Sequence, residues 1–188
     1  MRLAAPRIAP LDLGALDAEA AEVLAPFKER GPVLNIFATM ARAPQALKAF
    51  LGWGGYVLSK RNSLSERDRE LAILRTGFAC KAGYEWTQHV PIGLRGGLTA
   101  EEIERIKAGP GDPAWSPRDR AILTACDELV ATHFVTDATW TALEELGDRG
   151  RMDLVFTVGQ YTQVSMMLNS FGVQLDPGQS LDPALDAR

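Results

Sequence analysis

The chain has 188 residues, with 46% hydrophobic and 23% charged residues and a formal net charge of −4. That length suits one globular domain with a sizeable core, and the scattered, mildly acidic charge offers no basic surface for nucleic acid or anionic lipid. No apolar run reaches the roughly 20 residues of a membrane span, and prolines interrupt the N-terminus where a secretory signal would be apolar, so we expect a cytoplasmic protein that binds neither membrane nor nucleic acid.

Helix signals follow one another along the chain, and no segment alternates polar and apolar residues as a half-buried strand does. Residues 1–16, with Pro6 and Pro10, predict an extended arm. Capping residues, first-turn prolines and glycine stops then indicate a series of helices. They are predicted over 17–30 (interrupted at Pro26), 33–41, 44–58, 65–78, 84–94, 99–108, 116–130, 137–143 and 152–171.

The predicted fold is therefore all-α, in a single domain over residues 1–188 with its core at about 44–172. The helix over 152–171 is apolar on more than one face, which indicates burial in the core or in a subunit contact. The tail, residues 176–188, is rich in Asp, Pro and Gly, so we expect it to be mobile or draped over a neighbouring subunit.

The helix that begins after Ser65 interleaves basic and acidic residues, and the capping residue itself is a serine. This interleaving, which includes Arg69 and Glu70, predicts a solvated surface of paired charges. The two cysteines, Cys80 and Cys126, lie far apart in the sequence and give no disulfide framework.

One stretch concentrates the residues that can move protons. Glu85 and His89 are four residues apart and so share a helix face, with Tyr84 and Gln88 beside them. A carboxylate, an imidazole and a phenol within two turns fit an acid–base site, although a Glu–His pair is also common on helix surfaces. No second cluster completes a metal site, and His133 fits a helix C-terminus, where a cation is favoured.

The same stretch resembles a known family. Its features are Arg-Glu-Leu at 69–71, Tyr-Glu-Trp-x-x-His at 84–89 and Gly-Leu-Thr-x-x-Glu-Ile at 97–103. Together they resemble the carboxymuconolactone decarboxylase-like family, which also contains the alkylhydroperoxidase D proteins. The resemblance implies an alkylhydroperoxidase D-like helical bundle with extra N- and C-terminal helices, assembly into homo-oligomers (dimers, trimers or hexamers), and a site on the central helix pair.

The sequence departs from the redox branch of that family. The Cys-x-x-Cys pair of the alkylhydroperoxidase D proteins is replaced by Ala82 and Glu85, and Glu70 stands at the family's glutamate position. Disulfide chemistry needs an attacking thiolate and a resolving thiol, and both are missing there. A peroxiredoxin-type activity would therefore depend on Cys80 as a single reactive thiol.

The decarboxylase branch implies a cofactor-independent lyase that removes CO₂ from a small carboxylated lactone or carbonyl compound, with neither a metal nor an organic cofactor. On that resemblance His89 is the general acid/base, and Glu70 or Glu85 orients it. Three further residues are candidates for binding the substrate: Tyr84, Trp86 and Arg75, the last as a carboxylate clamp. An isomerase or hydratase on a similar substrate, and a non-catalytic oligomeric binding module, are the alternatives.

Overall fold

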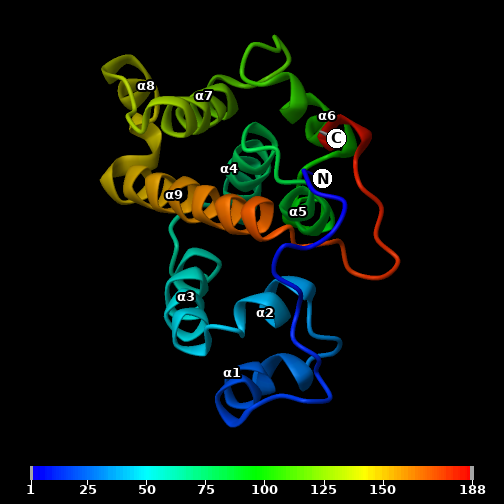
Figure 1. Cartoon of the computed structure of the whole chain (residues 1–188). Coiled ribbons are helices and arrows are strands. Elements are labelled where there is room, and N and C mark those ends of the chain that lie inside the picture. Colours follow the sequence, from blue (N-terminus) through cyan, green and yellow to red (C-terminus); the bar gives the residue numbers. More distant parts are fainter. Residues whose placement is uncertain (1, 187–188) are drawn as a thin grey trace.

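The computed structural model describes residues 2–186, and within these residues every regular element is helical (Figure 1). This confirms the prediction of an all-α fold. The α-helices are α1 (Ala18–Lys28), α2 (Asn35–Met40), α3 (Pro44–Val57), α4 (Glu66–Ala79), α5 (Gly83–Gly96), α6 (Ala100–Ala108), α7 (Pro117–Thr132), α8 (Asp137–Ala142) and α9 (Gly147–Phe171). Two short 3₁₀ turns, η1 (Glu144–Leu146) and η2 (Pro183–Leu185), complete the chain.

Most helix starts are where the capping residues predict them. The Ser65 hydroxyl accepts a hydrogen bond from the Asp68 backbone, and Thr99 and Glu102 form a reciprocal capping box. Other starts differ from the prediction, and α2 begins at Asn35 rather than at residue 33. The cap of α8 is Thr136 rather than Asp137, and α9 begins at Gly147 rather than at residue 152, because its first turn is polar and carries no apolar periodicity.

Helix α4 lies at the centre of the larger part of the molecule, packed against α5, α7 and α9 (Figure 1). Its Leu71 and Leu74 are fully buried in a cluster that also draws on α6 and α7. Burying a side chain of this size stabilises the fold by on the order of 2 kcal/mol. This core holds α4 and α5 rigidly side by side.

The same packing corrects the expectation that the charges of α4 are solvated. Asp68, Arg69 and Glu70 are 5%, 7% and 1% exposed. Arg67 is ion-paired, as expected, but its partner Asp119 lies on another helix, α7. Charge patterning along one helix does not show which neighbours cover it, and here helices surround α4.

The N-terminal helices α1–α3 form a separate layer beneath α5 and α9 (Figure 1). Phe27 of α1 and Phe37 of α2 stack with ring centroids 4.1 Å apart. Ile36 and Val57 join α2 and α3 to a cluster that includes Tyr161 of α9. This layer is therefore tied to the larger part through apolar contacts.

Both ends of the chain lie on its own surface. The arm runs past the end of α9, where the Arg7 and Ile8 backbones donate hydrogen bonds to the Phe171 carbonyl. The tail passes along α5 and reaches α6 (Figure 1), where Lys107 pairs with Asp182 and Leu185 is buried. The expectation of a tail that is mobile or draped over a neighbour is thus wrong for residues 176–186, whereas residues 187–188 lie outside the described part. No helix of residues 2–186 is long and apolar enough to cross a membrane.

Candidate active site

The centre of the candidate site is a contact between His89 of α5 and Glu70 of α4. The His89 Nδ1 and Glu70 Oε2 atoms are 2.7 Å apart, and the two residues are 8% and 1% exposed. With Glu70 as the acceptor, Nδ1 donates this hydrogen bond and Nε2 is the ring nitrogen left for other partners. Of the two glutamates that the sequence offered as partners, Glu70 is the one that contacts the imidazole.

The turn between the two helices explains this meeting. Lys81 adopts a left-handed conformation with a φ of 54°, and the Ala82 backbone donates a hydrogen bond to the Gly77 carbonyl. This closes α4 in the manner of a Schellman motif and reverses the chain within a few residues. Because α4 and α5 are then antiparallel, a residue early in α4 comes to face one late in α5.

Glu85 has a different environment, one turn earlier on α5. It is 2% exposed, its Oε2 accepts a hydrogen bond from the Ser165 hydroxyl at 3.0 Å, and its Oε1 has no partner among the described residues. Burial raises the pKa of this carboxyl well above its ordinary value of 4.5, and the nearby charge of Glu70 raises it further. Burial therefore favours the neutral form of the Glu85 carboxyl, whereas Glu70 contacts the histidine.

Beside these groups lies a cavity of about 420 Å³, enclosed by the N-terminal helices on one side and by α5 and α9 on the other. Its wall is largely aliphatic and aromatic, as in sites for small organic ligands. Arg30, an exposed residue, is the one Lys or Arg in the described wall. The polar residues of the wall are Tyr84, Glu85, Gln88, His89, Gln160 and Tyr161.

Tyr161 of α9 stands next to the histidine. The two rings meet edge to face, with centroids 4.9 Å apart and an interplanar angle of 88°. Burial, together with the charges of Glu70 and Glu85, raises the pKa of this phenol well above its ordinary value. Within residues 2–186 the hydroxyl makes no hydrogen bond, so it is a proton-bearing donor on the cavity wall.

The structure separates the three predicted substrate-binding residues. Tyr84 lines the cavity, but its hydroxyl already donates to Asp176 at 2.6 Å. Trp86 is 3% exposed, packs against Phe78 in the core and does not line the described cavity.

Arg75 is likewise not a clamp at this site. Its guanidinium binds Asp127 of α7 and the Ile106 carbonyl, at 2.8 and 2.9 Å. Arg75 follows Glu70 by five residues. At about 100° per residue, its side chain leaves α4 about 140° around the helix axis from that of Glu70. Arg75 thus links α4 to α6 and α7 on the side of α4 away from the histidine.

The cysteines do not form a redox pair. Cys80 is half-buried at the end of α4, and burial, with the charge of Glu85, raises the pKa of its thiol. Cys126 is buried in the core, where burial raises the pKa of its thiol to about 12. In the described part of the chain, neither lines the cavity, and no group of three His, Cys, Asp or Glu side chains is placed to hold a metal.

Two residues of the site escaped the sequence analysis. Tyr161 had been read as one of the apolar positions of its helix, and Gln160 had not been singled out. Gln160 is 4% exposed, yet neither atom of its amide has a partner among residues 2–186. Helix α9 carries further polar residues, such as Thr157 and Gln163, so the sequence alone does not single out this pair.

Comparison with known proteins agrees with the resemblance. The carboxymuconolactone decarboxylase family model matches residues 44–128 of this chain. A comparison with curated proteins gave no match.

Solved structures show that the fold is alkylhydroperoxidase D-like. An alkylhydroperoxidase AhpD core protein, a peroxidase-related protein from Ralstonia eutropha JMP134, is similar with a TM-score of 0.77 and 24% identity, covering 92% of this chain and 93% of its own. A peroxidase-related protein from Silicibacter sp. TM1040 gives a TM-score of 0.77 and 18% identity over 93% and 95% of the two chains. A variant of the debrominase Bmp8 in complex with 2,3,4-tribromopyrrole gives 0.71 and 14% over 90% and 91%.

Proposed function

We propose that the protein is a cofactor-independent lyase of the decarboxylase type that acts on a small, largely apolar carbonyl compound or lactone carrying a carboxyl group. The observation that carries this proposal is His89 on the wall of a largely apolar cavity, with the buried Glu70 behind it at 2.7 Å. The match of the carboxymuconolactone decarboxylase family model to residues 44–128 supports the same function, because that family is named after a decarboxylase.

The chemistry follows from the groups around the cavity. When the bond between the α-carbon and the carboxylate breaks, CO₂ leaves and its electron pair passes into an enolate. The Tyr161 hydroxyl donates a hydrogen bond to the enolate oxygen. The protonated His89 then gives its Nε2 proton to the carbon, and Glu70 stabilises the imidazolium before that transfer. Water returns the proton to His89, so the sum is a carboxylate and a proton converted to CO₂ and the protonated product.

Glu85 has a separate proposed role. In its neutral form Glu85, on the cavity wall, adds no second negative charge beside Glu70. A second negative charge there would repel an anionic substrate. Its Oε1 is buried against Gly77 of α4, so we propose that Glu85 acts on the substrate through its charge state and not through a hydrogen bond from that atom. We therefore propose that Glu70 orients the histidine and that Glu85 keeps the negative charge of this wall low.

A second candidate is an isomerase on an uncharged substrate, and the composition of the wall favours it. With Arg30 as the one Lys or Arg in the described wall, and that at an exposed position, the cavity suits a neutral enone or unsaturated lactone. Neutral His89 would first remove a proton next to the carbonyl and then return it at another carbon. The two candidates begin from opposite protonation states of His89, so their rates change in opposite directions as the pH rises.

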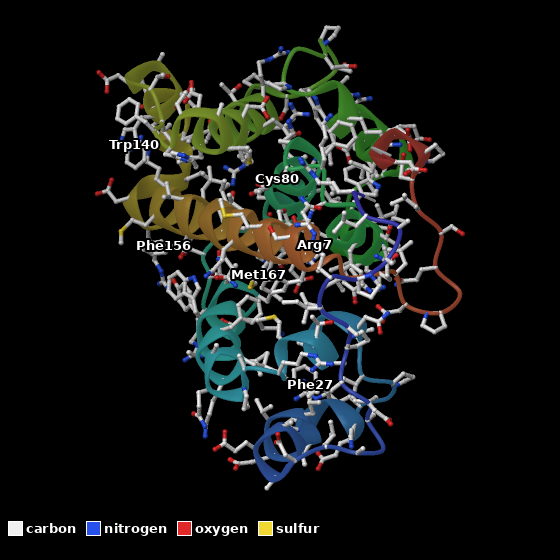
Figure 2. The ribbon with its side chains drawn as sticks, viewed as in Figure 1. Arg7, Phe27, Cys80, Trp140, Phe156 and Met167 are labelled. Atoms are coloured by element: carbon white, nitrogen blue, oxygen red, sulfur yellow. The ribbon has the colours of Figure 1, made fainter. Side chains whose placement is uncertain are left out.

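We also propose that the protein forms a homo-oligomer. Large apolar side chains stay exposed, among them Trp53 at 42%, Met152 at 53% and Met166 at 59%. Phe156 of the same surface meets the Trp53 ring edge to face at 5.3 Å, and Figure 2 shows it at one end of α9. Sedimentation equilibrium tests the assembly, and a monomer at micromolar concentration would contradict it.

The experiment that tests the function combines two readouts on one substrate panel. CO₂ release from β-keto acids and carboxylated lactones tests the lyase, and proton NMR of uncharged enones and lactones in D₂O tests the isomerase. We expect CO₂ release by the native protein, and loss of at least about a hundredfold in His89→Ala, the usual scale of general acid–base catalysis. Isomerisation without CO₂ release would replace the first candidate by the second.

The remaining alternatives have their own signatures in the same experiment. A peroxiredoxin-type protein would consume hydrogen peroxide and lose that activity in Cys80→Ser. A binding module would bind members of the panel without turning any of them over. Either result contradicts the proposed acid–base enzyme.

A further inference from the structure

We propose that Gln160 is the residue that selects the substrate, by pairing its amide with a ligand group that presents a hydrogen-bond acceptor and a donor side by side. A lactam, with C=O and N–H on one edge of a ring, and an undissociated carboxylic acid both have this pattern. This inference extends the proposed function. It depends on that proposal only in taking the bound molecule to be the substrate.

The first observation is the state of the amide itself. Gln160 is 4% exposed, and both Nε2 and Oε1 lack hydrogen-bond partners among the described residues. A buried primary amide normally satisfies its donors and its acceptor, because leaving them unmade forfeits the bonds that they had with water. A ligand that pairs with the Gln160 amide would therefore form hydrogen bonds that the described residues do not supply.

The second observation is its position. Gln160 lines the same cavity as His89 and directly precedes Tyr161 on α9. The unpartnered atoms are thus close to space that a small molecule can occupy, whereas an amide sealed among apolar side chains would have nothing to meet. A ligand held by Gln160 would lie within the cavity that contains the acid–base pair.

The third observation concerns the facing helix. Gly54 of α3 also lines the cavity, and a Cβ placed there would lie 3.6 Å from Gln160 Nε2. Gly55, its neighbour in the wall, likewise has no side chain to occupy this space. Gly54 therefore leaves only a narrow space beside the buried amide, and this favours a flat ring over a branched chain.

The chemistry of the ligand follows from the amide. One edge of a glutamine side chain presents an N–H donor and a carbonyl acceptor in a single plane, so it forms two bonds at once with a cis-amide or a carboxylic acid. A plain ketone satisfies only the donor. We therefore infer a preference for ring compounds with adjacent C=O and N–H, or for the acid form of a carboxyl group.

Calorimetric titration with δ-valerolactam, N-methyl-δ-valerolactam and cyclohexanone tests this preference. The first probe offers both groups, whereas the other two lack the donor. We expect the native protein to bind δ-valerolactam at least tenfold more tightly than either of the others. Gln160→Leu should remove that difference, while Gln163→Leu, at an exposed position of the same helix, should keep it.

Two further measurements keep the outcome clear. Gln160→Leu removes an amide without partners, so the melting temperature of this variant should equal or exceed that of the native protein. A lower melting temperature would show that the amide forms hydrogen bonds within the protein, and it would overturn the inference. Equal affinity of Gln160→Leu and the native protein for δ-valerolactam, or no binding by the native protein, would do the same. His89→Ala should retain the lactam preference, so a failure of the catalytic proposal is separable from a failure of this one.

Discussion

Glu70 and Glu85 show how two buried carboxyl groups on neighbouring helices acquire different roles. Glu70 accepts a hydrogen bond from His89 Nδ1, so its carboxyl group has the imidazole ring as its partner. Glu85 receives one hydrogen bond from Ser165 and no cation, so burial dominates and raises its pKa. The assignment of an ionised partner and a neutral acid follows from these surroundings.

Glu85→Gln tests the neutral state of Glu85. The folded-state pKa lies above the ordinary value of 4.5, so above that pH the folded protein binds more protons than the unfolded chain, and its stability falls as the pH rises toward the folded-state pKa. Glutamine mimics the neutral acid and does not ionise. We therefore expect the stability of Glu85→Gln relative to the native protein to increase as the pH rises above 4.5, in urea unfolding.

Glu29→Gln, at the exposed end of α1, is the matched control and should follow the native pH profile. If the stabilities of Glu85→Gln and the native protein change with pH in the same way, the Glu85 pKa is not raised by folding, and the proposed neutral form of Glu85 is contradicted.

The Cys80 thiol gives a second prediction at this scale. Burial, with the charge of Glu85, raises its pKa, and the thiolate is the form that attacks peroxide. We expect slow oxidation of the native protein by hydrogen peroxide at pH 7, as followed by mass spectrometry, and CO₂ release by Cys80→Ser within twofold of native. Oxidation as rapid as that of a dedicated peroxidase would instead favour the redox alternative.

At the scale of helices, the close contact of α4 and α5 depends on a glycine. A Cβ at Gly77 would lie 2.6 Å from Glu85 Oε1, well inside van der Waals contact. The glycine therefore makes room for the buried carboxyl, and the helix pair holds Glu70 against His89 one turn further on. The α4–α5 interface therefore determines both how these helices pack and how Glu70 and His89 are placed.

Gly77→Ala should accordingly destabilise the protein by roughly 1–3 kcal/mol through overpacking. Gly159→Ala is the control, because this glycine lies inside α9 with nothing within 4 Å of an added Cβ. There alanine should stabilise by roughly 0.5–1 kcal/mol through helix propensity. Chemical unfolding compares the two, and an unchanged or increased stability of Gly77→Ala would show that the α4–α5 contact is looser than described.

The helices and the central pair were predictable from the sequence to different extents. Caps such as Ser65 and Thr99 act locally, so they revealed where helices begin. The family pattern placed Glu70 and His89 together among the candidates, but their contact depends on the tight turn at Lys81. Tyr161 entered the site through tertiary packing of α9, and no local pattern distinguishes a phenol in a cavity from one in a core.

For the whole molecule, the tail was the feature that composition misjudged. Asp176 accepts hydrogen bonds from the Asn35 backbone, the Tyr84 hydroxyl and the Gln88 amide, at 2.8, 2.6 and 2.7 Å. One carboxylate thus ties α2, α5 and the tail together beside the cavity. A segment rich in Asp and Pro can be ordered when its acids find buried donors, which composition alone does not reveal.

Asp176→Ala should release this junction. We expect hydrogen exchange in residues 173–186 and in α2 to become faster, because both lose a shared anchor. Asp148→Ala, whose side chain is 96% exposed in the first turn of α9, should leave that exchange unchanged. Unaltered protection in Asp176→Ala would show that apolar contacts of the tail, such as those of Leu185, hold it without the carboxylate.

The measurement that most directly tests the central claim is the rate of CO₂ release from a β-keto acid in the native protein, Glu70→Gln and His89→Ala. If His89 moves the proton and Glu70 positions it, His89→Ala should lose at least about a hundredfold, and Glu70→Gln should lose less while its pH profile shifts. Circular dichroism controls for the fold of each variant. Native-like turnover in a folded His89→Ala would contradict the account.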